Sequence, residues 1–234
     1  MNQSVDLSIL IATKSRSNLL DEMLGSLEGA AAGLNYEVLV LSDDLTDHAV
    51  DSLKNHKAHQ IFKEKDVFSP GRQTWPKLYN YLFSKARGRW GMYASDDITF
   101  SEGCFNNALP FLDAMPPSVA GGIFFYRNMI AADREWEEFG IDFTFGRKLL
   151  LNYGLVRISD FRAVGGLDES YRFYCADGDL CLKLYQRGRD IVPVPGCLVV
   201  HNNIHDAQKL HNTAAADEDI HLYRKSWETS LDTG

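Results

Sequence analysis

The stretch Arg89-Trp90-Gly91-Met92-Tyr93-Ala94-Ser95-Asp96-Asp97-Ile98-Thr99 indicates how the chain is organised. It is a short apolar run that ends in two adjacent carboxylates, as expected where a buried strand reaches the carboxyl edge of a parallel sheet. Ligands of open α/β sheets bind at that edge. Adjacent carboxylates repel each other unless a cation neutralises them, and their hard oxygens suit Mg²⁺ or Mn²⁺ bridging a diphosphate. Ser95-Asp96-Asp97 is therefore a candidate metal and diphosphate site, with a simple turn cap after the strand as the alternative.

The composition describes an ordinary globular protein. The chain has 234 residues without a linker rich in Pro, Gly or Ser, so we expect one domain over residues 1–234. Hydrophobic residues make up 45% and charged residues 24%, which excludes a disordered or fibrous chain. The net charge of -8 argues against general nucleic-acid binding, which needs a basic face.

Cysteine usage and the absence of targeting signals favour a cytoplasmic location. The four cysteines show no CxxC spacing, so neither a zinc site nor a redox pair is indicated, and free thiols fit a reducing compartment. The sequence shows no signal peptide, and no apolar run has the length of a transmembrane segment.

Strands and helices alternate along the first hundred residues. Leu7–Ala12 reads as a strand, and Ser17 is placed to cap the helix that follows. Tyr36–Leu41 reads as a second strand and a third is expected around His59–Phe62, before a helix that begins at Pro76. This alternation predicts βαβ units, hence an α/β fold whose mostly parallel sheet has helices on both faces.

Polar residues at the ends of the first two strands predict a nucleotide pocket. Thr13 and Arg16 follow the first strand, and Asp44 follows the second. A right-handed crossover brings these ends to one edge of the sheet, where they could hold a base and a ribose.

The second half continues with further helices and strands. The segment Arg127–Lys148 is irregular, and aromatic residues such as Trp136 could stack on a sugar there or simply pack in the core. Two carboxylates alternate in Ala176-Asp177-Gly178-Asp179, where a helix dipole would favour them. The expected elements are a helix at Gly103–Met115, strands at Gly121–Tyr126 and Leu155–Ile158, a helix from Ala176 to Gly188, a strand at Ile191–Val200 and a final helix at Ala214–Trp227.

Taken in order, these motifs resemble the family 2 glycosyltransferases of the GT-A fold. The resemblance covers about Leu7 to His201 and implies a nucleotide-binding half (about 1–100), an acceptor and catalytic-base half (about 101–205) and a C-terminal helix (about 213–228). It is carried by Thr13 with Arg16, the Asp43-Asp44 edge, Tyr93-Ala94-Ser95-Asp96-Asp97, Val164-Gly165-Gly166-Leu167-Asp168-Glu169 and Asp177-Gly178-Asp179-Leu180 with its trailing Gly188.

The resemblance implies roles for residues on the donor side. Asp44 is similar to the carboxylate that accepts from the nucleotide base, and Asp96 to a residue near the ribose and donor sugar. Asp97 resembles the metal ligand that closes the Asp-x-Asp-like motif. His201 best fits the histidine that completes the metal shell in this family, with His205 as the other candidate. Ala12-Thr13-Lys14-Ser15 replaces the family's usual Pro-Thr-Tyr-Asn, a departure that lies at the expected nucleotide pocket.

On the acceptor side, Asp177 resembles the catalytic base. The family pattern there is usually Glu-Asp-x-Asp, and Ala176 replaces the Glu in this chain. The departure affects contacts to the acceptor, for which Asp179 and Trp136 are the candidates.

The chemistry that follows is an inverting transfer. Mn²⁺ or Mg²⁺ would stabilise the diphosphate leaving group of a nucleotide sugar, with UDP the expected nucleotide. Asp177 would take the proton of the saccharide or other hydroxyl acceptor. In-line displacement at the anomeric carbon inverts its configuration. Arg16, Arg72 and Lys77 are equal candidates for contacts to the phosphates.

Two other functions remain open. A sugar-nucleotide nucleotidyltransferase also places carboxylates around Mg²⁺, but its usual glycine-rich loop after the first strand is absent from Ala12-Thr13-Lys14-Ser15-Arg16. A catalytically inactive nucleotide- or sugar-binding module on the same fold is indicated only by the missing Glu before Asp177.

Overall fold

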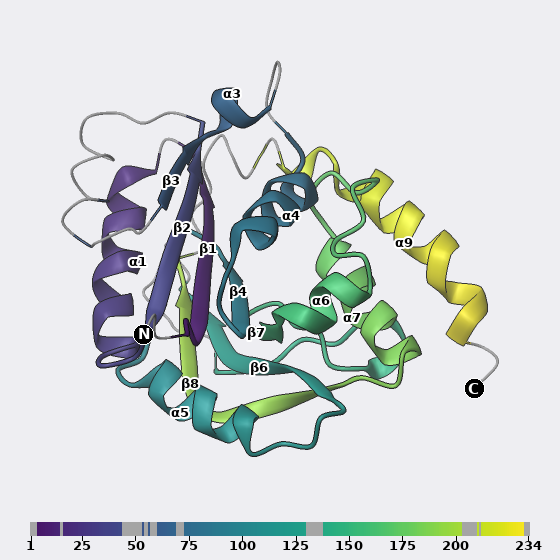
Figure 1. Cartoon of the computed structure of the whole chain (residues 1–234). Helices are drawn as coiled ribbons and strands as arrows, with labels where there is room; N and C mark the ends of the chain where they lie inside the picture. Colours follow the sequence, from purple (N-terminus) through teal and green to yellow (C-terminus); the bar gives the residue numbers. More distant parts are fainter. Residues whose placement is uncertain are drawn as a thin grey trace.

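One sheet organises the computed structural model, which describes residues 4–14, 16–43, 53, 56, 60–68, 73–129, 138–202, 210 and 212–231. In these residues the sheet has eight strands in the order β3-β2-β1-β4-β7-β6-β8-β5 (Figure 1). Strands β3, β2, β1 and β4 are parallel, as are β6 and β8, whereas β7 and β5 run antiparallel to their neighbours. The strands are β1 (Leu7–Thr13), β2 (Tyr36–Ser42), β3 (Gln60–Lys63), β4 (Trp90–Ala94), β5 (Ile98–Phe100), β6 (Val119–Asn128), β7 (Gly154–Arg157) and β8 (Asp190–His201).

Side-chain alternation along β1 divides the interior into two cores. Leu7, Ile9 and Ile11 point to one face, where α1 (Ser17–Ala30) and α5 (Cys104–Asp113) pack. Leu10 points to the other face, which is covered by α4 (Trp75–Lys85), α6 (Ile158–Ala163) and α7 (Ala176–Gln186). The strand is buried on both faces, so it reads as a continuous apolar run. The predicted α/β fold, with a mostly parallel sheet and helices on both faces, is confirmed.

The stretch from Arg89 to Thr99 forms the predicted central strand and one further strand. All five residues of β4 are buried, and β4 lies beside β1 in parallel register. Beyond the carboxylates, Ile98–Phe100 forms β5 along β8 at the margin of the sheet. Three residues are too few to show a period-2 pattern, so the sequence did not predict this strand.

The outer strands of the described sheet are both short. Among the residues that the structure describes, β3 has four residues and pairs only with β2, while β5 has three and pairs only with β8. The remaining short elements are α3 (Glu64–Val67) and the 3₁₀ turn η1 (Phe145–Arg147).

Two expected helix boundaries are corrected. Ser17 was expected to cap α1, but it is the first helical residue, and Arg16 occupies the cap position without a side-chain cap bond. The helix thus begins one residue earlier than the cap pattern predicts, and the Arg16 side chain contacts the carboxylates after β4 instead of capping the helix. The final helix, α9, spans Ala216–Leu231 instead of Ala214–Trp227, and it lies beyond α6 and α7 at the outer side of the molecule (Figure 1).

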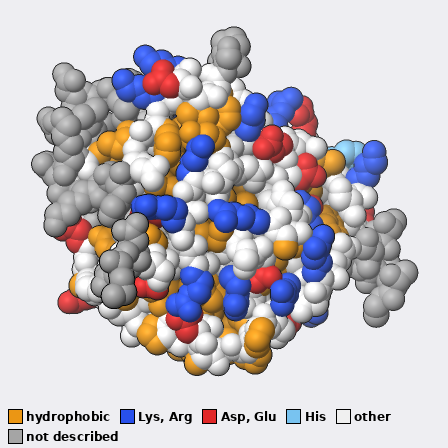
Figure 2. Space-filling view, viewed as in Figure 1, with side chains coloured by type: hydrophobic (Ala, Val, Ile, Leu, Met, Phe, Trp, Pro, Cys, Tyr) orange, Lys and Arg blue, Asp and Glu red, His pale blue; other side chains and the backbone are white. Residues whose placement is uncertain are grey.

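Basic side chains are frequent on one surface despite the net charge of -8. Figure 2 shows Lys and Arg spread over the face seen in Figure 1, with acidic side chains between them. Several described arginines form ion pairs, among them Arg87 with Glu37 and Arg89 with Asp113. Within the described residues, no helix is both long and apolar enough to cross a membrane.

Candidate active site

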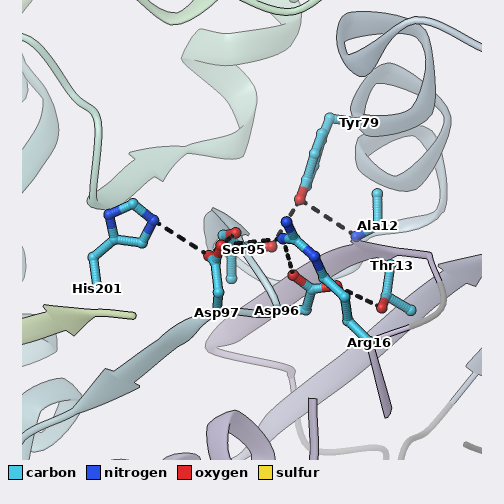
Figure 3. A network of polar contacts seen from close by, with 9 residues as sticks. Ala12, Thr13, Arg16, Tyr79, Ser95, Asp96, Asp97 and His201 are labelled. Atoms are coloured by element: carbon cyan, nitrogen blue, oxygen red, sulfur yellow. Dashed lines mark hydrogen bonds and ion pairs between the residues drawn. The ribbon is translucent and has the colours of Figure 1, made fainter. Parts of the chain in front are cut away.

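Arg16 joins the two adjacent carboxylates at the edge of the sheet (Figure 3). Its Nη1 lies 3.2 Å from Oδ1 of Asp96 and 3.1 Å from Oδ2 of Asp97. Thr13, the last residue of β1, donates its hydroxyl to the other oxygen of Asp96 at 2.7 Å. The sequence predicted that Thr13 and Arg16 would lie together, and the parallel pairing of β1 with β4 adds both carboxylates to the same cluster.

The two carboxyl groups have pKa shifts in opposite directions. Burial and the neighbouring charge of Asp97 raise the pKa of Asp96 to about 6, although Thr13 and Arg16 oppose the shift. Burial also acts to raise the pKa of Asp97, but the contacts with His201 and Ser95 and the charge of Arg16 outweigh it, so the pKa is lowered. Near neutral pH, Asp97 is the more firmly ionised carboxylate.

His201 faces Asp97 across the end of β8. Its Nδ1 lies 2.8 Å from Oδ1 of Asn128, and its Nε2 lies 3.6 Å from Oδ1 of Asp97. When Nδ1 carries the proton and donates to Asn128, Nε2 and Oδ1 of Asp97 form a nitrogen and oxygen donor pair for a metal ion. The pair therefore fits a divalent cation, with Asn128 fixing the histidine ring from behind.

The described residues contain no cluster of three or more His, Cys, Asp and Glu that could hold a metal by themselves. Mg²⁺ commonly takes only one or two carboxylates and completes its shell with water and substrate phosphates. Asp97 and His201 suit that kind of site, in which the nucleotide brings the remaining ligands.

Tyr79 of α4 inserts its hydroxyl between the ends of β1 and β4 (Figure 3). The hydroxyl donates to the carbonyl of Ala94 at 2.7 Å and accepts from the N–H of Ala12 at 3.3 Å. The strands pair as far as Ile11 and Ala94, so Tyr79 satisfies backbone groups where that pairing stops. Tyr79 thus links the ends of β1 and β4 directly before the residues of the site.

A cavity of about 1190 Å³ connects this cluster with the first turn of α7. Thr13, Arg16, Asp96, Asp97 and His201 line one part of it. Asp177 lines another part, among many aromatic side chains. These are Trp75, Tyr79, Tyr93, Tyr126, Phe143, Phe145, Tyr153, Phe173, Tyr174 and Tyr223.

Asp177 is half-buried in this wall. The N-terminal turn of α7 holds it in place, since Oδ1 accepts the N–H of Gly178 at 2.9 Å. The residue before the helix, Cys175, has a left-handed backbone with a φ of 65°. Burial, with a further contribution from Asp142, raises the pKa of Asp177 to about 6. A carboxylate with a pKa near the working pH is suited to accept and release a proton.

Asp179 differs from its neighbour although both lie in the first turn of α7. It is only 4% exposed, accepts from Nε1 of Trp227 at 3.0 Å and lies 2.7 Å from Nζ of Lys183. It does not line the cavity. Because α7 turns this side chain toward α9, its position does not favour the acceptor contact that the sequence suggested.

Several predicted residues cannot be placed. Asp44, Arg72, Trp136 and His205 lie outside the described residues. Lys77 is described, but its Nζ lies over the ring of Phe68, 5.4 Å from the centroid, and it does not line the cavity.

Sequence reasoning missed residues that long-range packing brings to the site. Tyr79, Asn128 and Tyr153 are separated in sequence from the motifs that they support. Tyr153 lies against His201, with a centroid separation of 5.9 Å. No local pattern marks such residues, since the helix face of Tyr79 could equally face ordinary core.

The comparisons with known proteins agree with this geometry. Residues 8–166 match the sequence family described as glycosyl transferase family 2. The chain belongs to this family. It is thus a glycosyltransferase domain, as the resemblance predicted.

One similar characterised protein is the rhamnosyltransferase WbbL of Escherichia coli (strain K12). It is 40% identical over 63 residues, which make up 27% of this chain and 24% of that protein. Among solved structures, residues 1–349 of TarS from S. aureus superpose with a TM-score of 0.65 at 16% identity. This match covers 85% of this chain and 60% of that one.

The mannosyltransferase PcManGT from Pyrobaculum calidifontis gives a TM-score of 0.64 at 12% identity, with coverage of 88% of this chain and 59% of that one. At such identities the similarity shows the fold alone, and it confirms the expected GT-A architecture. The chain spans no more than 60% of the length of either of these two solved structures.

Proposed function

We propose that this domain transfers a sugar from a nucleoside diphosphate sugar, with UDP as the favoured nucleotide, to a hydroxyl acceptor with inversion at the anomeric carbon. The observation that carries the proposal is the single cavity that joins the Asp96 and Asp97 cluster to Asp177. Structures of the similar TarS hold UDP and UDP-GlcNAc, and one of GalNAc-T7 holds UDP, GalNAc and Mn²⁺. PcManGT was solved with GDP-Man and Mn²⁺, so the donor screen below includes GDP as well as UDP.

On the donor side, the chain's own groups bind and orient the nucleotide sugar. Arg16 presents a guanidinium at the cavity, suited to paired hydrogen bonds with phosphate oxygens. Asp96 and Thr13 form a hydrogen-bonded pair that can accept from the hydroxyls of a ribose or sugar. Asp44 and Arg72 stay proposed nucleotide contacts on the resemblance alone.

Asp97 and His201 are the residues that would hold Mn²⁺ or Mg²⁺. A cation bound there supplies charge stabilisation for the diphosphate as it leaves. Asn128 keeps the histidine in the required tautomer through the bond to Nδ1.

On the acceptor side, Asp177 removes the proton from the attacking hydroxyl. Its raised pKa, about 6, leaves it ionised near neutral pH yet basic enough to take a proton. Aromatic side chains line the cavity around Asp177, and Trp136 remains a proposed acceptor contact. Attack opposite the leaving diphosphate inverts the configuration.

The test is Asp177→Asn, which preserves shape but removes the acceptor for the proton. Thermal shift against UDP, GDP, CDP and dTDP and their sugars, with and without Mn²⁺, first identifies the donor, because a ligand that binds only the folded state raises its stability. We expect Asp177→Asn to bind that donor like the wild type while turnover falls about 10²–10⁴-fold.

Asp168→Asn is the matched control. Asp168 accepts the N–H of Ser170 within its own loop and does not line the cavity. Wild-type turnover in Asp177→Asn would reject the base assignment. Donor binding by a wild-type protein that neither hydrolyses nor transfers it would favour an inactive binding module instead.

A further inference from the structure

One carboxylate of α9 binds three consecutive backbone N–H groups of the loop before α7. Oδ1 of Asp219 accepts from Arg172 at 2.8 Å, and Oδ2 accepts from Phe173 at 2.8 Å and from Tyr174 at 2.7 Å. The side chain is 2% exposed, so water does not compete for these bonds. Hydrogen bonds to a buried, charged acceptor are among the stronger ones in proteins.

The loop that Asp219 holds is also a wall of the cavity and the entry to α7. Arg172, Phe173, Tyr174 and Cys175 all line the cavity, and Asp177 follows two residues after Cys175. The carbonyl of Arg172 accepts from the N–H of Trp75 at 2.9 Å, which ties the other side of the loop to the start of α4.

The backbone of this loop requires external support. Cys175 adopts a φ of 65°, a left-handed conformation that is costly for a residue with a side chain. Such a conformation persists where surrounding contacts hold it, and the three bonds to Asp219 immediately precede it.

Two further contacts join α9 to the first turn of α7. Nε1 of Trp227 donates to Asp179 at 3.0 Å. The ring of Tyr223 lies directly on Gly178, where an added Cβ would come within 2.7 Å of its hydroxyl oxygen. Helix α9 therefore fixes both the loop before Asp177 and the turn that follows it.

We propose that Asp219 is a positioning residue for the transfer reaction. Through the backbone of residues 172–174, it sets the place and burial of Asp177 without touching substrate itself. This inference rests on the proposed function, in which Asp177 is the general base.

The pH profile of turnover reports on this role. The titratable groups around Asp177 are Asp142, Tyr93, Tyr153, Cys175, Cys181 and Tyr223. The pKa values of the phenols and thiols are raised by burial, so these groups stay neutral near pH 6. Asp142 is the carboxylate among them. A loosened loop would admit water to Asp177 and lower its pKa.

The experiment compares Asp219→Asn with Glu218→Gln. Asparagine keeps the shape but has one acceptor oxygen and turns an NH₂ group toward N–H donors. Glu218 is the matched control, because it lies on the same helix and meets the same loop through an exposed ion pair with Arg172 at 3.1 Å. The probes are UDP for binding and UDP-GlcNAc or GDP-mannose, whichever raises the melting temperature, for turnover.

We expect Asp219→Asn to lower kcat about 10–100-fold, the scale of a small misplacement of a catalytic group. UDP binding should stay unchanged, and the acid limb of the kcat profile should move below pH 6. Hydrogen exchange of the 172–174 amides should become about tenfold faster or more. Asp219→Glu, which restores a carboxylate, should recover part of kcat, whereas Glu218→Gln should match the wild type in every measurement.

Wild-type kcat and pH profile in Asp219→Asn would overturn the proposal, as would unprotected 172–174 amides in the wild-type protein. The second measurement needs no variant, so it decides the matter even if Asp219→Asn does not fold. If Asp177→Asn is inactive while Asp219→Asn is normal, only the positioning role fails. If Asp177→Asn keeps full turnover, the general base assignment fails first.

Discussion

Asp96 and Asp97 are adjacent in the chain, and the guanidinium group of Arg16 forms an ion pair with each of them. Arg16 contacts an oxygen of each carboxylate, so the protein supplies its own cation to a pair that would otherwise repel. A bound divalent ion would compete for the same charge. In the proposed function, Arg16 would then turn toward the phosphates of the nucleotide.

Arg16→Ala should therefore change the response to metal. In the variant we expect Mn²⁺ alone to raise the melting temperature about 2–4 °C more than in the wild type, the scale of ~1 kcal/mol for a chain of this size. Differential scanning fluorimetry with and without EDTA measures the shift. Arg89→Ala, which removes an exposed ion pair with Asp113, is the control. Equal Mn²⁺ shifts in Arg16→Ala and wild type would show that the guanidinium and the metal do not compete.

The raised pKa of Asp177 predicts a pH dependence of both activity and stability. Turnover should rise with pH and reach half its maximum near pH 6, where Asp177 ionises. Between its ordinary pKa of 3.8 and about 6, the folded protein holds a proton that the unfolded chain releases. Protonated Asp177 therefore stabilises the folded state fully below pH 3.8, and this stabilisation is lost as the pH rises through about 6.

Urea unfolding at pH 5 and pH 7.5 checks the linkage. Asp96 also has a pKa of about 6, so it contributes to the same loss. Asp177→Asn should lose less stability between these pH values than the wild type, by roughly 1–2 kcal/mol. An identical loss in both proteins would mean that Asp177 is well hydrated in the folded state.

At the scale of elements, Tyr79 links helix α4 to the ends of β1 and β4. Tyr79→Phe would leave the N–H of Ala12 and the carbonyl of Ala94 without this partner, so we expect a loss of about 1–3 kcal/mol in the free energy of unfolding. Chemical denaturation measures it. Tyr81→Phe, on the same helix and packed edge-on against Phe62, should cost much less. Similar losses in the two variants would show that the Tyr79 hydroxyl does not support the strands.

Elements with a strong hydrophobic pattern were predictable from the sequence, whereas elements that depend on pairing with a distant part of the chain were not. The apolar run of β1 and the apolar face of α4 can both be recognised from local sequence patterns. Strand β5 is defined by its pairing with β8, and the position before α1 is occupied by Arg16, whose side chain contacts carboxylates far away in the chain. Both outcomes depend on partners far away in the chain.

The candidate site follows the same division. Thr13, Asp96 and Asp97 stand at strand ends, so sheet topology alone predicts that they meet. The orientation of Asp179 toward Trp227 depends on how α9 packs, and the support from Asn128 behind His201 depends on the pairing of β6 with β8. These relations arise in tertiary structure and leave no mark in local sequence.

At the scale of the whole molecule, two glycines distinguish close packing from open surface. A Cβ on Gly122 would lie 2.6 Å from a methyl of Val194 and 2.7 Å from one of Leu112, both in the core. Gly122→Ala should therefore destabilise the fold by about 1–3 kcal/mol. Gly29 lies within α1 with nothing within 4 Å of an added Cβ, so Gly29→Ala should stabilise by about 0.5–1 kcal/mol. Thermal and urea unfolding measure the change in stability of each variant. An unchanged stability in Gly122→Ala would indicate that the side chains around Gly122 can move apart at little cost.

The shortness of the two outer strands has a consequence for self-association. An edge strand presents unpaired N–H and C=O groups, and a long flat edge invites another chain to add a strand and begin aggregation. Here β3 offers four residues before the chain turns into α3, and β5 offers three before the turn into α5. Each of these two strands is too short to template an extended intermolecular sheet, even though Ile61 exposes 38% of its surface on β3. The buried apolar strands β1 and β4 both lie in the interior of the described sheet, each with a paired strand on either side.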